Sequence, residues 1–136
     1  MPGNRDLRER TKHFALRVVK VVEALPKGRT ADAIGRQLVR AGTSVGANYR
    51  AACHSRSAAE FLSRMAIVEE EADESAYWME LLVESGIMPQ ARMCELLGEA
   101  DQLVAIAISS IKGPAARHRQ FQTRFSGGHQ VLARRP

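Results

Sequence analysis

Aromatic residues are scarce in this sequence: phenylalanine, tryptophan and tyrosine make up 5% of it, with a single tryptophan. The core of a β-rich fold draws on aromatic and β-branched side chains, so this scarcity argues against one. Aliphatic side chains and alanine must fill the core instead, and alanine and leucine favour helix. The composition therefore predicts an all-α protein.

Long apolar runs are also missing. No stretch approaches the ~20 residues that a membrane span needs, and the polar residues 1–12 contain no apolar signal core. Only two cysteines occur, Cys53 and Cys94, which fits a reducing compartment better than a disulfide framework. We therefore expect a cytoplasmic protein that does not enter a membrane.

The motifs that carry enzyme chemistry are not found. None of the four histidines has an acidic residue three positions before it, as a di-iron bundle requires, and the two cysteines stand apart without nearby metal ligands. Two Arg-x4-His pairs resemble those of some helical ribonucleases, Arg8 with His13 and Arg124 with His129, but chance accounts for two matches. We predict no cofactor, no metal and no enzymatic activity; a helical ribonuclease is the least favoured alternative.

Turn signals divide residues 1–112 into four segments. Proline, glycine or serine interrupts the pattern at residues 26–28, 55–57 and 86–89. Ser57 and Glu60 form a capping box, Thr30 is a candidate N-cap, and Gly86 suits a helix C-terminus. The predicted helices cover residues 5–25, 31–54, 58–85 and 89–112.

Each of these segments contains a seam of small or apolar residues spaced alternately four and three positions apart. In the second segment the seam comprises Ile34, Leu38, Ala41, Val45, Asn48 and Ala52. A spacing of ~3.5 residues is that of knobs-into-holes packing. Four consecutive seams with short connections predict an up-down-up-down four-helix bundle over residues 1–112. Because Asn48 is polar at a seam position, we expect it to be buried with its amide hydrogen-bonded.

Further apolar residues lie outside the seams of the third and fourth segments, among them Ile67, Trp78, Leu81 and Leu103. They fit either a wide core stripe, which is common in globular bundles, or a subunit interface anchored by Trp78. The second interpretation predicts self-association through these four residues.

Charge is divided unevenly along the chain. Residues 1–56 contain twelve Lys or Arg and four Asp or Glu, a net charge of +8, whereas residues 57–112 contain three and eleven, a net charge of −8. Equal and opposite charges predict ion pairing, within one subunit or between subunits. Residues 113–136 contain five arginines and no acid, and form either a flexible, disordered tail or a basic arm for nucleic acid.

A second basic feature lies on the second helix, where Arg36, Thr43 and Arg50 recur at heptad spacing on the outer face. They could attract nucleic acid, unless acids of the third helix neutralise them. In the tail, Phe121 and Phe125 are available to stack on bases. The predicted contacts with RNA or DNA are Arg36, Arg50, Arg117, Arg119 and Arg124.

Residues 37–48, QLVRAGTSVGAN, resemble a family signature, Q-L-x-R-A-x-x-S-I/V-x-A-N. It is that of the bacterial four-helix-bundle family named after proteins encoded in intervening sequences of 23S rRNA genes. Ser57, Glu60 and Phe61 match the family's S-x-x-E-F helix start, and residues 5–7 are similar to its opening. The resemblance covers roughly residues 5–112. Residues 49–52, Tyr-Arg-Ala-Ala, depart from the Ile-Ala-Glu-Gly that often follows the signature.

The resemblance implies a four-helix bundle, a ring-shaped homopentamer and no enzymatic activity. A relative, the accessory protein of diversity-generating retroelements, binds nucleic acid and a reverse transcriptase, so both are expected kinds of partner. We therefore expect a non-catalytic oligomer that binds nucleic acid, a protein partner or both. The alternative is an assembly module without a nucleic-acid role.

The signature residues Arg40, Ser44 and Asn48 form a polar motif with a structural interpretation. Ser44 and Asn48 are four positions apart, so they can face one neighbouring helix. Arg40 could reach an acid of the third helix, such as Glu70, Glu71 or Glu74.

Overall fold

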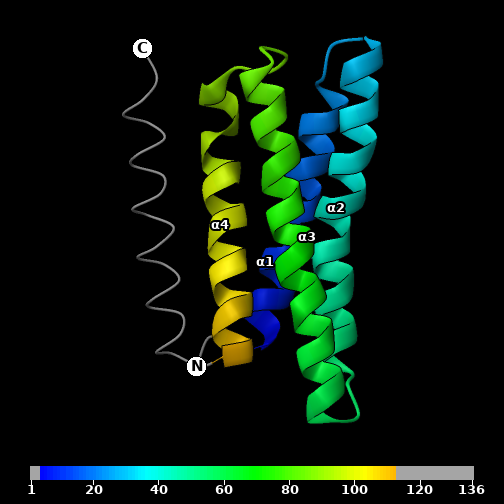
Figure 1. Cartoon of the computed structure of the whole chain (residues 1–136), viewed down its shortest axis with the longest axis vertical. Coiled ribbons are helices and arrows are strands. Elements are labelled where there is room, and N and C mark those ends of the chain that lie inside the picture. The colour runs from blue at the N-terminus through cyan, green and yellow to red at the C-terminus, as the bar shows by residue number, and fades with distance from the viewer. Residues whose placement is uncertain (1–3, 113–136) are drawn as a thin grey trace.

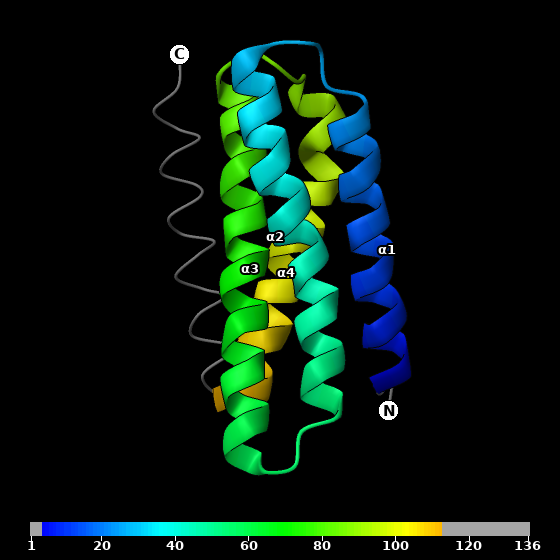
Figure 2. The same cartoon turned by 90° about the vertical axis from the view of Figure 1, so that its right-hand side faces the viewer.

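The computed structural model describes residues 4–112, which form four α-helices joined by short loops (Figure 1). They are α1 (Asn4–Glu23), α2 (Arg29–Cys53), α3 (Ala58–Glu84) and α4 (Gln90–Lys112). Successive helices run in opposite directions, and the predicted up-down-up-down bundle is confirmed (Figures 1 and 2). The predicted helix ends lie within two residues of those observed.

The helix ends follow local hydrogen bonding. At the start of α3, the Glu60 backbone N–H donates to Ser57 Oγ at 3.1 Å, and the Glu60 carboxylate accepts from the Arg56 backbone N–H. Beyond the end of α3, Gly86 has a φ of 81°, a left-handed conformation that glycine adopts without strain. The prediction for Thr30 was wrong: α2 already begins at Arg29, and Gly28 takes the N-cap position without a side-chain bond.

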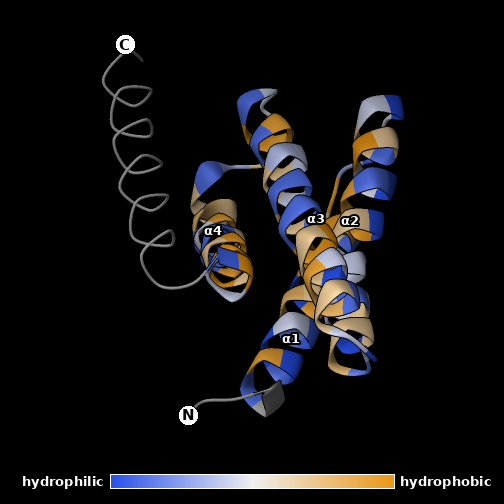
Figure 3. Ribbon diagram, turned by 60° about the horizontal axis from the view of Figure 1, so that its bottom comes forward, coloured by the Kyte–Doolittle hydropathy of each residue, from blue (hydrophilic) through white to orange (hydrophobic). Residues whose placement is uncertain are grey.

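Aliphatic and thioether side chains fill the core, as the scarcity of aromatic residues predicts. Apolar and polar residues share the surface of every helix (Figure 3), and the apolar seams meet inside the bundle. Ser75 is fully buried, and its hydroxyl donates to the Glu71 carbonyl at 2.7 Å, which satisfies a polar group inside the core. The largest fully buried apolar side chains are Phe14, Leu38, Met65, Met79, Leu82, Met93 and Leu103.

The four pairs of neighbouring helices do not pack equally closely. Helix α1 packs mainly against α2 and approaches α4 over much less of its length. Glycines of α2 permit the close approach to α1: a Cβ added at Gly42 would lie 2.8 Å from both Cγ atoms of Val18. On the looser side Arg10 of α1 bridges to α4, with its Nε and Nη2 donating to the Glu99 carboxylate at 2.9 and 2.6 Å.

Two further findings concern the described residues. Cys53 and Cys94 are free thiols and do not bridge. None of the four helices is both long enough and apolar enough to cross a membrane.

Candidate nucleic-acid interface

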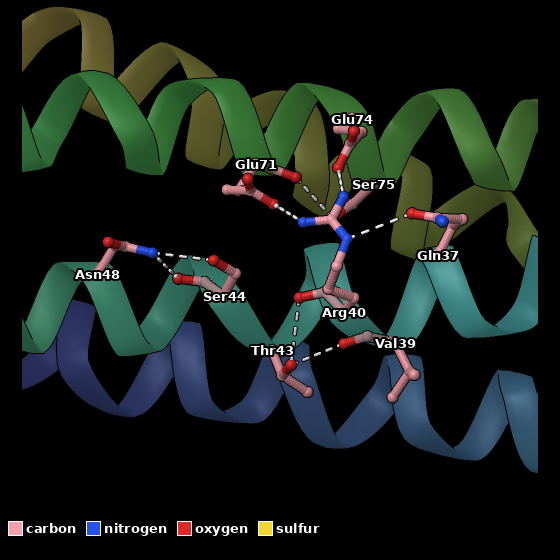
Figure 4. Close-up of polar contacts among 9 residues, drawn as sticks. All are labelled: Gln37, Val39, Arg40, Thr43, Ser44, Asn48, Glu71, Glu74 and Ser75. Atoms are coloured by element: carbon pink, nitrogen blue, oxygen red, sulfur yellow. Dashed lines mark hydrogen bonds and ion pairs between the residues drawn. The ribbon is translucent and has the colours of Figure 1, made fainter.

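Arg40 joins α2 to α3 through two carboxylates (Figure 4). Its guanidinium pairs with Glu71 at 3.2 Å and with Glu74, and it also donates to the side-chain oxygen of Gln37. The hydrogen bond to Glu74 raises the pKa of Arg40 above its ordinary value. The expectation that Arg40 reaches an acid of the third helix is thus realised at Glu71 and Glu74.

Ser44 and Asn48 continue the same edge of α2 toward its C-terminus (Figure 4). Asn48 Nδ2 donates to both the carbonyl and the hydroxyl oxygen of Ser44, each at 2.9 Å. The amide is therefore hydrogen-bonded as predicted. Asn48 is only half-buried, however, because it lies at the edge of the core rather than at its centre.

The ion pairs connect the basic half of the sequence to the acidic half. Arg10 pairs with Glu99, Arg17 with Glu95, and Arg40 with Glu71 and Glu74. Pairing within one subunit therefore offsets part of the opposite charge of residues 1–56 and 57–112.

Arg36 and Arg50 lie on a different side of α2 from this network. Each residue turns an α-helix by ~100°, so Arg36 and Thr43 lie a quarter-turn beyond Gly35 and Gly42, on the side of α2 next to α1. Figure 4 shows Thr43 turned away from α3. Arg36 and Arg50 are exposed and form no ion pair within residues 4–112. The acids of α3 therefore pair with Arg40 and not with Arg36 or Arg50.

Helix α1 adds cations to the same side. An Arg8 guanidinium nitrogen lies 3.4 Å from His54 Nε2, at the C-terminal end of α2 and one turn beyond Arg50. Lys12 follows Arg8 by one turn and is exposed. We call Arg8, Lys12, Arg36 and Arg50 the basic face. Sequence reasoning missed its α1 members, although their four-residue spacing was visible.

Of the Arg-x4-His match at Arg8 and His13, Arg8 hydrogen-bonds to His54 and not to His13. Beside this contact, burial and a hydrogen bond with Cys53 raise the pKa of Tyr49 above its usual value. Within residues 4–112, no group of three or more His, Cys, Asp or Glu side chains is placed to hold a metal ion. Arg117, Arg119, Arg124 and the rest of the predicted tail lie outside the described residues.

The predicted subunit interface is corrected at one position. Leu103 is 2% exposed and belongs to the core of its own subunit, so its surface is not open to a partner. Ile67, Trp78 and Leu81 are only partly buried. With Glu71 and Glu74 between them they follow spacings of four and three, so they share the edge of α3 next to the Arg40 pairs.

Trp78 is an unusual member of this edge. Its Nε1 is buried but has no hydrogen-bond partner among the described residues. Its ring packs edge-on against Tyr77, with centroids 5.1 Å apart, while Tyr77 itself is 51% exposed.

These features define an antiparallel four-helix bundle that is basic on the side formed by α1 and α2. The sequence profile of the 23S rRNA-intervening sequence protein family matches residues 4–109, and the chain belongs to this family. A solved structure is also similar, that of a protein of unknown function from the S23 ribosomal protein family of Bacteroides thetaiotaomicron. It shares 27% identity at a TM-score of 0.69, over 77% of this chain and 97% of that one. No curated protein matched the chain.

Proposed function

We propose that the protein is a non-catalytic, self-associating bundle of the cytoplasm that binds the phosphate backbone of RNA or DNA through the basic face. The observation that supports this most directly is the separation of Arg36 and Arg50 from the acids of α3. Because Arg40 engages Glu71 and Glu74, the two outer arginines remain available to a polyanion.

The expected binding is weak and independent of sequence. Cations on a helix surface contact phosphates rather than base edges, which gives register but no sequence information. If all four cations of the basic face contact phosphates, log affinity falls against log salt with a slope of about −3 to −4 for duplex DNA. An oligomer would repeat the face in each subunit and strengthen binding by avidity.

A titration of the full chain with RNA and DNA at low salt tests this proposal. Arg36→Glu/Arg50→Glu should abolish binding, because it replaces two cations of the basic face by anions. Arg64→Glu/Arg92→Glu is the matched control: it changes exposed arginines of α3 and α4 and gives the same net charge. Equal loss in both variants, or no binding by the unchanged chain, contradicts the proposal and favours the assembly module without a nucleic-acid role.

Self-association is supported by a separate observation, the partly exposed edge of Ile67, Trp78 and Leu81. Aromatic anchors of this kind are enriched at interface centres, and the pentamer is inferred by resemblance. Sedimentation of the full chain should show an oligomer that Leu81→Lys weakens. Leu16→Lys, at a 54% exposed leucine of α1, should leave it intact. A monomer at micromolar concentration contradicts this part of the proposal.

One further partner, a reverse transcriptase, and one alternative activity, RNA cleavage, can each be tested by experiment. A reverse transcriptase is a candidate protein partner through the retroelement accessory relative, and co-purification with such an enzyme tests it. A ribonuclease would instead cleave RNA in a manner lost when both His13 and His129 are replaced, and we expect no cleavage.

A further inference from the structure

A second charged surface lies on α3, on the side opposite Glu71. Its residues follow spacings of three and four, so they form one continuous stripe along the helix. Leu62, at 40% exposure, and Tyr77 are two of the large apolar side chains that the described residues leave exposed. We call this surface the acidic stripe; its members are Leu62, Ala66, Glu69, Asp73, Tyr77, Glu80 and Glu84.

The electrostatics of α3 favour a cation at this stripe. The helix contains eight acidic residues and one basic residue, Arg64, and Arg40 lies beside Glu71 and Glu74, on the other side. Glu80 and Glu84 lie in the last two turns, where the negative end of the helix dipole disfavours carboxylates, and the last turn has no basic residue. A cation beside them offsets both their mutual repulsion and the dipole.

The chain itself supplies a segment of matching chemistry. Residues 113–136 contain five arginines, no acid, and two phenylalanines, Phe121 and Phe125. They follow Lys112, the last residue of α4, and α4 packs along α3. Because α4 is antiparallel to α3, the end of α4 lies at the pole where α3 begins (Figure 1). The segment is almost as long as the 27 residues of α3, so it can reach the far end of the stripe.

We infer that residues 113–136 dock intramolecularly along the acidic stripe, with arginines beside its carboxylates and phenylalanine against its exposed apolar side chains. The covalent link favours this contact, since a short tether gives an effective concentration in the millimolar range. This surface is distinct from the basic face, so the inference goes beyond the proposed function and fails or holds independently of it. Docking also withdraws the tail arginines from nucleic acid.

Energy transfer in the full chain tests the inference. Trp78, the only tryptophan and the neighbour of Tyr77, is the donor; an acceptor dye is attached at Ser126→Cys in a Cys53→Ser/Cys94→Ser chain. Docking predicts transfer at low salt that is lost at 1 M salt, where the Debye length is only about 3 Å. Asp73→Lys/Glu80→Lys should abolish the transfer. Glu23→Lys/Asp32→Lys, a matched change of exposed acids on α1 and α2, should not.

Tryptic cleavage provides a second measurement that leaves the cysteines unchanged. In the folded full chain, cleavage after Arg117, Arg119 and Arg124 should be slow at low salt. It should become faster in Asp73→Asn/Glu80→Gln but not in Glu23→Gln/Asp32→Asn. Equal behaviour of the stripe and control variants in both measurements overturns the inference. Transfer that disappears when labelled chain is diluted with unlabelled chain also overturns it, because the occupant is then another copy.

Discussion

Replacing Gly42 by alanine tests the close approach of α1 and α2. In an isolated helix this change is favourable by up to ~1 kcal/mol, because glycine has the larger conformational entropy in the unfolded chain. Here the new Cβ would lie 2.8 Å from both Cγ atoms of Val18, which is β-branched and fully buried, so it cannot rotate away. Overpacking of this kind costs about 1–3 kcal/mol. We expect a net destabilisation of about 1 kcal/mol.

A double-mutant cycle measured by urea denaturation identifies the cause. Val18→Ala alone should cost about 2 kcal/mol, through lost burial and a cavity. In that background Gly42→Ala should become stabilising, because the clashing methyl groups are gone. Gly98→Ala is the control: a Cβ there meets nothing within 4 Å, and it should stabilise by up to ~1 kcal/mol. Gly42→Ala that stabilises the otherwise unchanged protein as Gly98→Ala does would refute the described α1–α2 packing.

Two further predictions concern other groups. Arg10→Met leaves the Glu99 carboxylate, whose side chain is 17% exposed, without its two-point partner and should lower the free energy of unfolding by about 1–2 kcal/mol. Arg17→Met should change it by less than ~0.5 kcal/mol, because Arg17 lies 3.7 Å from a 94% exposed Glu95; equal losses would contradict this. Burial raises the pKa of Tyr49 above its ordinary 10.0, so the folded state keeps a proton that the unfolded state releases. Stability should therefore fall as pH rises past 10, and Tyr49→Phe should reduce that fall in denaturation measured across alkaline pH.

Periodicity identified the helices because it reports a local property, the side of each helix that avoids water. The seams of all four segments meet in the core, and Ser57 and Gly86 occupy the helix ends that their chemistry predicts. The prediction of Thr30 as the N-cap was wrong because several residues of one loop can precede the first turn of a helix. Local sequence does not decide among them when the loop also has to place α1 against α2.

Leu103 shows that periodicity does not predict the burial of apolar residues outside the seams. It lies outside the seam of its helix, as Ile67, Trp78 and Leu81 do, but it is buried while they remain partly exposed. The difference in burial depends on how far the neighbouring helices cover each of these side chains. The sequence of one helix does not determine that coverage. The charged residues behave alike: the sequence placed Arg40 within reach of the third helix, but it left open whether the acids of that helix also neutralise Arg36 and Arg50.

The sequence by itself determined the number, direction and inner faces of the helices, because hydrophobic spacing and turn residues act within one segment. Only the tertiary structure decided that Glu71 and Glu74, rather than Glu70, pair with Arg40. It also decided that Arg8 and Lys12 share a side with Arg36 and Arg50, and that Leu103 belongs to the core. The rotation of each helix about its own axis and the choice of its neighbours determine which charges meet, and both are set by packing of the whole bundle.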